Sequence, residues 1–383
     1  MQITSKLPDV GTSIFTRIGM MASKYQCLNL AQGFPNFGVD PRLPELIDQH
    51  TKAGKNQYAP ATGVTELRRA ISRKKELLYG YAPNPDTEIT VTIGATEAIF
   101  SSIQALVHPG DEVIYFEPAY DSYVPAIRLA GGQPIALSLN APDFEVNWDE
   151  VRQKINERTR LIIINNPHNP SGTIWSEADM HELQQLLEGT NILLLSDEVY
   201  QHLVYDGQIH HSVLRYPKLY RRAVVTMSFG KTFHATGWRV GYAIAPPEIS
   251  AELRRIHQFN TFSAYTPVQY ALADYLAEPE HYLQLPEQFQ ARRDRFLAGL
   301  SKASFQLLPS AGTYFVCADF SDQWSGSDLE LAERLITEHG IAAIPMGEFY
   351  EDKRKTGLLR FCFAKDEKTL DEAAEILTKI VIR

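Results

Sequence analysis

The chain has 383 residues, a formal net charge of -9 and a hydrophobic share of 44%. This composition is typical of a soluble globular protein with about two to three domain-sized cores. The acidic balance argues against nucleic acid or an anionic membrane as a partner, because either would select a basic surface.

The sequence shows neither a secretion signal at its N-terminus nor an apolar run near the roughly 20 residues that span a bilayer. Its three cysteines, Cys27, Cys317 and Cys362, are too few and too far apart for a disulfide framework or a clustered metal site. His210 and His211 are adjacent in the sequence, so their side chains are poorly oriented to bind one metal ion together. We therefore expect a cytoplasmic protein that binds no metal and no membrane.

Between residues 88 and 246, short apolar runs alternate with amphipathic stretches such as residues 176–189. The runs cover residues 88–94, 111–118, 160–167, 191–198, 223–230 and 239–246. Continuous apolar runs suit strands that are buried on both faces, and their alternation with helices predicts a largely parallel α/β sheet. Ligands of such sheets bind beyond the carboxyl ends of the strands.

After about residue 280 the pattern changes to that of a smaller α+β domain. Helices are expected at 285–303, 328–340 and 366–382, strands at 313–320 and 358–364, and a short apolar run at 341–346. The first 40 or so residues show little regular pattern and are expected to form an arm that packs on either domain or on a partner subunit. The predicted large domain covers residues 38–279, and residues 1–37 and 280–383 form the arm and the small domain.

Polar residues follow three of the predicted strands. Asp197 comes directly after ILLLS, where an aspartate could equally be a helix N-cap. The NNPHNPSG loop that contains Asn169 has the composition of an ordinary turn. Ser228 and Lys231 follow VVTM, and a lone lysine at such a place is usually a solvated surface charge.

Small residues separate the strand at 88–94 from the amphipathic stretch after it. Gly94, Ala95 and Thr96 would let backbone N–H groups approach an anion at a helix N-terminus, although a tight strand–helix turn would have the same composition. Together these features suit one ligand with an anionic end, a basic ring nitrogen to face Asp197 and a carbonyl within reach of Lys231. Pyridoxal phosphate has all three.

Eight motifs connect the chain to a known family: NLAQGFPNF, NQYAP, TIGATEA, EPAYDSY, NNPHNPSG, SDEVY, SFGKTFHATGWRVGY and LRFCFAK. With them the chain resembles the class I and II aminotransferases over its whole length. Within these it resembles the kynurenine aminotransferase/glutamine transaminase K group, and bacterial methionine aminotransferases most of all. The resemblance implies the pyridoxal-phosphate-dependent transferase fold of type I. This is an α/β fold with a mostly parallel seven-stranded sheet between helices in the large domain, plus a smaller α+β domain.

The resemblance also implies which residues hold the cofactor ring. Lys231 would form the Schiff base with pyridoxal 5'-phosphate, and Asp197 would pair with the protonated pyridine nitrogen. Tyr200 and Asn169 would hydrogen-bond the phenolic oxygen, and Tyr120 would stack on the ring. An opposite charge near the pyridine nitrogen favours its protonated form, so that the ring can accept electrons when the Cα–H bond breaks. Lys231 then moves the proton as general base and acid.

Two further groups of residues would hold the anionic ends of the cofactor and the substrate. The phosphate contacts implied by the resemblance are Ala95, Thr96, Ser228 and Arg239, with Tyr58 contributed by the other subunit of a homodimer. Arg360 would grip the substrate α-carboxylate, aided by Asn169 and the Gly33 backbone. Arginine suits both sites because its planar fork bonds oxyanions in pairs.

The expected reaction moves the amino group of methionine to a 2-oxo acid by a ping-pong mechanism through aldimine and ketimine. Phe15 and Phe262 match aromatic residues of the side-chain pocket, and no second arginine clearly matches one that would grip a dicarboxylate. Thr96 replaces an aromatic residue, and Ser263 stands where a histidine occurs in the kynurenine branch. Methionine is therefore the expected donor, with glutamine, leucine and aromatic amino acids as secondary donors.

Three other functions are weighed against this hypothesis. A pyridoxal-phosphate C–S β-lyase would share the fold, Lys231, Asp197 and Arg360, so the sequence separates it only weakly. A regulator on the same fold would usually carry a fused basic DNA-binding domain, for which this acidic chain has no room. A nicotinamide-dependent dehydrogenase would need G-x-G-x-x-G after its first strand, and the sequence does not contain it there.

Overall fold

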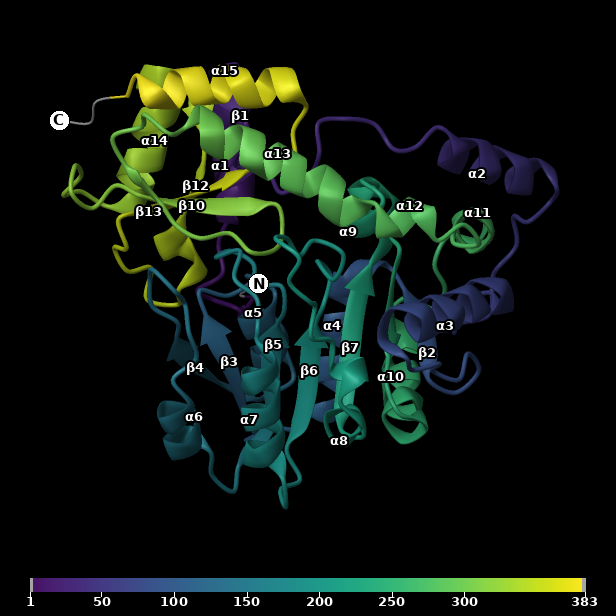
Figure 1. Cartoon of the computed structure of the whole chain (residues 1–383). Helices are drawn as coiled ribbons and strands as arrows, with labels where there is room; N and C mark the ends of the chain where they lie inside the picture. The colour runs from purple at the N-terminus through teal and green to yellow at the C-terminus, as the bar shows by residue number, and fades with distance from the viewer. Residues whose placement is uncertain (1–2, 381–383) are drawn as a thin grey trace.

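The computed structural model describes residues 3–380 and contains a large sheet with a smaller body above it (Figure 1). The seven-stranded sheet has the order β2-β8-β7-β6-β5-β3-β4. Its strands are β2 (Ile89–Thr92), β3 (Glu112–Glu117), β4 (Gln133–Ser138), β5 (Thr159–Asn165), β6 (Leu193–Asp197), β7 (Ala223–Ser228) and β8 (Gly241–Ile244). Only β8 runs antiparallel to its neighbours β2 and β7. The mostly parallel seven-stranded sheet is therefore confirmed.

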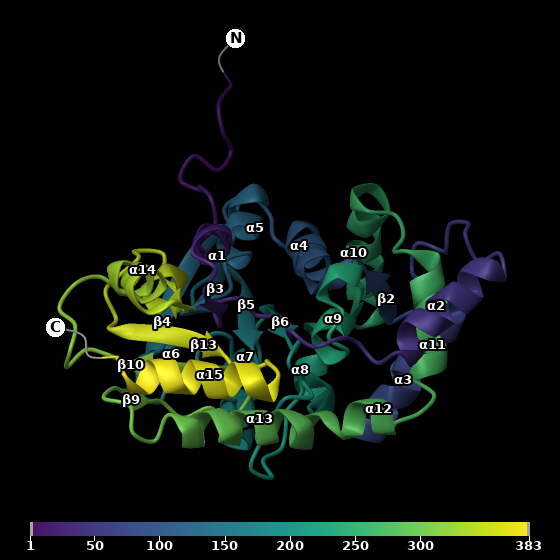
Figure 2. The ribbon, with the colours of Figure 1, turned by 90° about the horizontal axis from the view of Figure 1, so that it is seen from above.

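Helices cover both faces of this sheet, as the view from above shows (Figure 2). One face packs against α4 (Gly94–Leu106), α5 (Tyr123–Leu129) and α10 (Pro247–Asn260), and the other packs against α3 (Thr65–Tyr79), α6 (Trp148–Lys154) and α7 (Glu177–Leu187). On β3, Val113 and Tyr115 pack on the face with α4, α5 and α10, whereas Ile114 and Phe116 pack on the face with α3, α6 and α7. Burial on both faces explains why the strands read as continuous apolar runs.

The edge strand β4 did not stand out as an apolar run in the sequence. It begins at Gln133 and Pro134, and most of its residues are only half-buried. Edge strands tolerate proline and polar residues because one side of their backbone is unpaired. The pattern of a fully buried strand is therefore missing here.

The smaller body is built on a four-stranded antiparallel sheet of order β12-β13-β10-β9. Its strands are β9 (Gln306–Leu307), β10 (Phe315–Asp319), β12 (Ile344–Pro345) and β13 (Leu358–Cys362), and its helices are α13 (Leu285–Gly299), α14 (Asp328–His339) and α15 (Glu367–Thr378). The helix expected at 366–382 thus ends at Thr378, and its positions 381 and 382 lie outside the described residues. The domain boundaries at residues 38 and 280 stay predictions.

The N-terminal arm is more regular than its sequence suggested. It contains α1 (Ile14–Lys24), whose N-cap Ser13 accepts a hydrogen bond from the Thr16 N–H. After α1 the short strand β1 (Leu28–Asn29) pairs in parallel with β11 (Ile341–Ala342), which attaches the arm to the smaller body. Residues 3–12 lead away from the rest of the chain (Figure 2).

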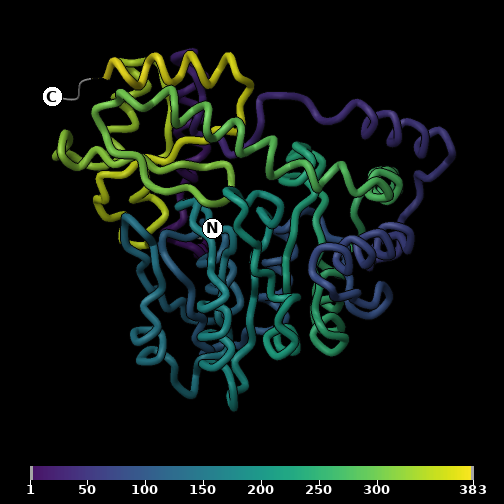
Figure 3. The backbone as a smooth tube through the Cα atoms, viewed as in Figure 1, coloured from purple at the N-terminus to yellow at the C-terminus, as the bar shows by residue number. Residues whose placement is uncertain are grey.

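The remaining helices are α2 (Arg42–Lys52), α8 (Pro217–Tyr220), α9 (Phe229–Thr232), α11 (Thr266–Tyr275) and α12 (Glu280–Leu283). They include two short ones that flank β7 within the large body, α8 before it and α9 after it. Figure 3 shows the chain passing from the smaller body across the top of the molecule to α2. Within residues 3–380, no helix is both long and apolar enough to cross a bilayer. The same part of the chain holds no group of three or more histidine, cysteine or acidic side chains placed to bind a metal ion.

Candidate active site

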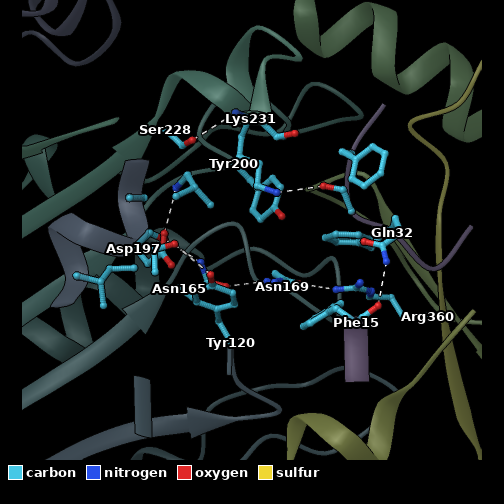
Figure 4. A pocket seen from close by; sticks show the side chains of 18 of the residues that line it. Phe15, Gln32, Tyr120, Asn165, Asn169, Asp197, Tyr200, Ser228, Lys231 and Arg360 are labelled. Carbon is cyan, nitrogen blue, oxygen red and sulfur yellow. Dashed lines mark hydrogen bonds between the residues drawn. The ribbon is translucent and has the colours of Figure 1, made fainter. Parts of the chain in front are cut away.

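A cavity of about 270 Å³ lies where the carboxyl ends of the central parallel strands meet the smaller body, and Figure 4 shows it from close by. Twelve of the predicted site residues line it: Phe15, Gly33, Ala95, Thr96, Tyr120, Asn169, Asp197, Tyr200, Ser228, Lys231, Arg239 and Arg360. They come from the arm, from both bodies and from loops far apart in the sequence. Ligands of a parallel sheet bind beyond the carboxyl ends of its strands, which explains why polar residues follow β5, β6 and β7.

Lys231 lies in α9, the single helical turn that follows β7. Ser228 is the N-cap of this turn, and its hydroxyl accepts a hydrogen bond from the Lys231 N–H at 3.3 Å. The Lys231 ammonium donates to the Gly33 carbonyl at 3.0 Å, which also accepts from the Tyr314 hydroxyl at 2.5 Å. Burial lowers the pKa of Lys231 to about 8. Lys231 is thus no solvated surface charge, and much of it is neutral in mildly alkaline solution.

Asp197 is the last residue of β6 and is 3% exposed. Its Oδ2 accepts from the Tyr123 hydroxyl at 2.7 Å, and its Oδ1 accepts from the Val199 N–H at 3.3 Å. The residues after Asp197 form a turn rather than an α-helix, so the alternative of a helix N-cap is wrong. Burial raises the pKa of Asp197 to about 6, and a cation opposite the carboxylate would lower this pKa again.

Glycines bring two chain segments together at the start of α4. Gly94 has φ of +72°, and a Cβ there would lie 2.7 Å from Nη2 of Arg239. A Cβ on Gly241 of β8 would lie 2.6 Å from the Met227 carbonyl oxygen and 2.7 Å from the Ala95 nitrogen. The first N–H groups of α4 and the Arg239 guanidinium therefore lie together, and such a donor set fits a phosphate group.

Tyr120 forms a wall of the cavity between these groups. Its hydroxyl is 3.1 Å from the Thr96 hydroxyl, and its ring packs edge-on against Tyr123, with the ring centroids 5.7 Å apart. Asn169 lies between Asp197 and Arg360 (Figure 4). Its backbone N–H donates to the Asn165 side chain at 2.7 Å, and the Asn165 amide in turn donates to the Asp197 carbonyl at 2.9 Å.

Arg360 lies on β13 and is 1% exposed. Its Nη1 donates to the Asn169 side-chain oxygen at 2.6 Å and its Nη2 to the Ala31 carbonyl at 3.2 Å. Its Nε is buried and has no hydrogen-bond partner in the structure. The guanidinium lies 3.8 Å from the centroid of the Phe315 ring, which fixes its plane. A buried guanidinium with an unsatisfied donor is suited to a carboxylate ligand.

Two predicted residues do not line this cavity. Tyr58 is 86% exposed and Phe262 is 42% exposed. Their rings contact each other edge-on, with the centroids 5.4 Å apart. Within one chain neither side chain is part of the site, so their predicted roles require a second subunit and stay predictions.

The sequence reasoning missed part of the cavity wall and its supports. The missed lining residues are Gln32, Phe34, Ile99, Asn165, Val199, Thr236 and Phe315. Asn165 is the first residue of the NNPHNPSG motif and the last residue of β5, so its place at a strand end was the available signal. Tyr123 gave no signal beyond its position in EPAYDSY.

The two histidines considered for metal binding have other partners. His210 is 8% exposed, and its ring contacts the Tyr79 hydroxyl at 2.9 Å and the Asn166 carbonyl at 3.0 Å. His211 contacts the Tyr216 hydroxyl at 2.7 Å. Both rings are thus explained by hydrogen bonds within the protein.

Comparison with known proteins gives full-length matches. A family model for the class I and II aminotransferases matches residues 25–377. The chain is 51% identical to a methionine aminotransferase of Escherichia coli K12 over 98% of both chains. It is 34% identical to a kynurenine–oxoglutarate transaminase of Dictyostelium discoideum, over 97% of this chain and 94% of the relative.

Solved structures agree with these sequence matches. An Escherichia coli protein whose crystal structure and reactivity identify a methionine aminotransferase function has a TM-score of 0.97 at 50% identity, covering 99% of this chain and all of that chain. An aspartate aminotransferase of Thermus thermophilus has a TM-score of 0.90 at 29% identity, with 99% of this chain covered and all of that one. The family match agrees with the fold and with the hydrogen-bond donors that line the cavity. The chain therefore belongs to the pyridoxal-phosphate-dependent class I and II aminotransferases.

Proposed function

We propose that this aminotransferase moves the amino group of methionine to a 2-oxo acid in a ping-pong reaction. The observation that carries the proposal is the cavity itself. It places the Lys231 amine and the buried Arg360 guanidinium in one space, where they can hold the two ends of an amino acid. The similarity to the Escherichia coli enzyme over the whole chain supports methionine as the donor.

Lys231 is the residue that we assign to covalent attachment and proton transfer. Bound pyridoxal phosphate supplies an aldehyde and an electron-accepting ring. The lowered pKa of Lys231, about 8, leaves a useful fraction of its amine neutral, so the amine can act as a nucleophile and later as a base. The Gly33 carbonyl, 3.0 Å away, orients the Nζ atom toward the cavity.

Residues around Lys231 would hold the ring in a fixed orientation. Asp197 would face the ring nitrogen, and Tyr120 would cover one face of the ring. Tyr200 and Asn169 line the cavity where the phenolic oxygen would lie. Burial raises the pKa of the Tyr200 phenol above its ordinary value, so this hydroxyl remains a hydrogen-bond donor.

The phosphate site would use the first turn of α4 together with two side chains. We assign to it the Ala95 and Thr96 N–H groups, the Ser228 hydroxyl and the Arg239 guanidinium. Arg239 Nη1 donates to the Thr236 carbonyl at 3.1 Å, which holds the side chain beside α4. Charge-assisted bonds of this type each contribute about 1.5–3 kcal/mol.

Arg360 would bind the substrate α-carboxylate together with the Asn169 side chain and the Gly33 backbone. The cations that line the cavity are Lys231, Arg239 and Arg360. All three have a role in this assignment, so none remains for a second carboxylate. Phe15 and Phe34 add apolar surface. This lining suits uncharged donors such as methionine, with glutamine, leucine and aromatic amino acids as secondary donors. The lyase alternative is not favoured, because the relatives described above are aminotransferases.

A donor panel tests the proposed substrate. The purified enzyme is assayed with methionine, glutamine, leucine, phenylalanine and aspartate against several 2-oxo acids, and kcat/KM is compared. Methionine should rank above aspartate by at least about 100-fold, because a side-chain carboxylate would be buried without a partner. A preference for aspartate would contradict the assignment. Release of pyruvate and ammonia from cystathionine without amino transfer would indicate the lyase.

We also propose a cytoplasmic homodimer in which Tyr58 of one subunit completes the phosphate site of the other. Tyr58 is exposed, and so are the nearby aromatic residues Phe259 and Tyr265, at 86% and 58%. Such a group of exposed aromatics is typical of an interface. Phe262, which contacts Tyr58, would then approach the partner's substrate pocket.

Subunit mixing tests this arrangement. Lys231→Ala and Tyr58→Ala proteins are each weakly active or inactive as homodimers. After they are mixed, denatured and refolded, half of the dimers are hybrids that contain one complete site. The mixture should recover about a quarter of the wild-type activity. Recovery of none would show that Tyr58 acts within its own subunit, and a monomer in light scattering would exclude the dimer.

A further inference from the structure

We propose that Tyr123 is a positioning residue that holds Asp197 ionised and turns one of its oxygens toward the ring nitrogen of pyridoxal phosphate. The inference rests on the proposed role of Asp197 in this aminotransferase. Tyr123 itself does not line the cavity, so its role would be indirect, through Asp197.

The geometry assigns the two carboxylate oxygens different tasks. Tyr123 is the first residue of α5 and is 2% exposed. Its hydroxyl donates to Oδ2 of Asp197 at 2.7 Å, whereas Oδ1 has only the longer 3.3 Å contact with the Val199 N–H. A short bond from one side fixes the rotation of the carboxylate. Oδ1 is then left with capacity for a second, stronger donor.

Tyr123 is also joined to the wall that covers the cofactor ring. Its ring packs edge-on against Tyr120, with an interplanar angle of 82°. Tyr120 is held in turn by the Thr96 hydroxyl at 3.1 Å. One side chain thus contacts both the residue proposed to stack on the ring and the residue proposed to face its nitrogen.

Burial and hydrogen bonding act on Asp197 in opposite directions. Burial raises the pKa of Asp197, and the Tyr123 hydrogen bond, the Val199 N–H and the charge of Lys231 lower it. The titratable groups that face Asp197 are Tyr120, Tyr123, Tyr200 and Lys231. The pKa of the Tyr123 phenol is raised well above its ordinary value, so Tyr123 remains a donor over the whole accessible pH range. Loss of its hydroxyl should therefore raise the pKa of Asp197 and leave about half or more of the carboxyl groups protonated at pH 7.

The test measures cofactor binding rather than turnover. Apoprotein carrying Tyr123→Phe is titrated with pyridoxamine 5'-phosphate by calorimetry from pH 6 to 9. The pH at which binding becomes strong should move upward by about one to two units, the equivalent of one charged hydrogen bond. At pH 7 binding should be about two- to tenfold weaker than in the wild type, and at pH 9 the two should nearly agree.

A second probe separates positioning from general damage. In 1-deazapyridoxamine 5'-phosphate a carbon replaces the ring nitrogen, so a protonated Asp197 is no disadvantage. Tyr123→Phe should not weaken its binding at any pH. Equal weakening of both probes, or weakening that does not change with pH, would overturn the proposal and show a structural role only. Unchanged binding of pyridoxamine 5'-phosphate would also overturn it.

The chain offers a matched control. Tyr220 is 6% exposed and donates to Oε1 of Glu88 at 2.8 Å, outside the cavity lining. Tyr220→Phe removes the same hydroxyl from the same kind of buried carboxylate and should leave both titrations unchanged. In an Asp197→Asn background, Tyr123→Phe should have no further pH-dependent effect, and an additive effect there would refute the coupling. No amino acid enters these assays, so their outcome is independent of the proposed preference for methionine.

Discussion

Replacing Lys74 by methionine should make this protein more stable at neutral pH. Lys74 lies in α3 and is 2% exposed, and its Nζ has no hydrogen-bond partner in the structure. Its nearest favourable contacts are aromatic faces, with the Tyr282 ring centroid 4.8 Å away and those of Phe229 and Phe233 at 5.9 Å. Such contacts offset only part of the loss of hydration of a buried ammonium.

The size of the effect follows from the pKa of Lys74. Burial lowers this pKa from 10.5 to about 7. A folded-state pKa below the unfolded one means that the unfolded chain binds more protons, so this penalty on stability is largest below pH 7 and vanishes as pH rises toward 10.5. At pH 7 the penalty is on the order of 4 kcal/mol, and at pH 10 it is about 1 kcal/mol. Methionine fills a similar volume and carries no charge.

Urea unfolding of Lys74→Met and wild-type holoenzyme at pH 6, 8 and 10 tests this reasoning. The difference in the free energy of unfolding between the two proteins reports the loss of the Lys74 charge, including its repulsion of Lys75 and His202, whose pKa values it lowers. The variant should gain about 2–4 kcal/mol at pH 6, and the gain should shrink steadily toward pH 10. Lys52→Met, at a side chain 77% exposed, should show no such trend. A gain that does not change with pH, or a loss at pH 6, would refute the argument.

Three further substitutions test the site. Lys231→Ala should lower methionine turnover by about 10³-fold or more and abolish the visible absorption of the covalently attached cofactor; turnover near the wild-type rate would exclude the assigned role. Arg360→Lys should lower kcat/KM about 10- to 100-fold for every amino donor, because one charged hydrogen bond and the planar fork are lost; a loss confined to one donor would place Arg360 at the side chain instead. Gly241→Ala brings a Cβ within 2.6 Å of the Met227 carbonyl oxygen. We therefore expect a stability loss of about 1–3 kcal/mol in thermal unfolding and weaker phosphate binding. An unchanged melting temperature would show that β8 can move.

The sequence predicted those strands whose two faces are both buried. Strands buried on both faces appear as unbroken apolar runs, and β5 and β7 lie where these runs were found. The edge strand β4 lacks this pattern because its residues are only half-buried. Helix α1 was also missed, although Ser13 is a local N-cap signal, because a short helix takes most of its stability from tertiary packing and not from local propensity.

Site residues could be predicted from the sequence where one motif contains several of them. SFGKTFHATGWR contains Ser228, Lys231 and Arg239, and all three line one cavity. Contacts made by a side chain through another residue could not be predicted in this way. The hydrogen bond from Tyr123 to Asp197 joins α5 to the end of β6, 74 residues apart in the chain, and no spacing rule connects such positions.

Burial drives the two central groups of the site toward neutrality from opposite sides. It raises the pKa of Asp197 to about 6 and lowers that of Lys231 to about 8. Above pH 6 the carboxylate becomes ionised and can balance a cationic ring nitrogen, whereas the amine becomes nucleophilic only as pH approaches 8. The two requirements are therefore met together on the alkaline side of neutrality. We expect the rate at which apoprotein takes up pyridoxal phosphate to rise with pH through about 8, with Lys231 and not Asp197 setting the midpoint; a midpoint near 6 would reverse this assignment.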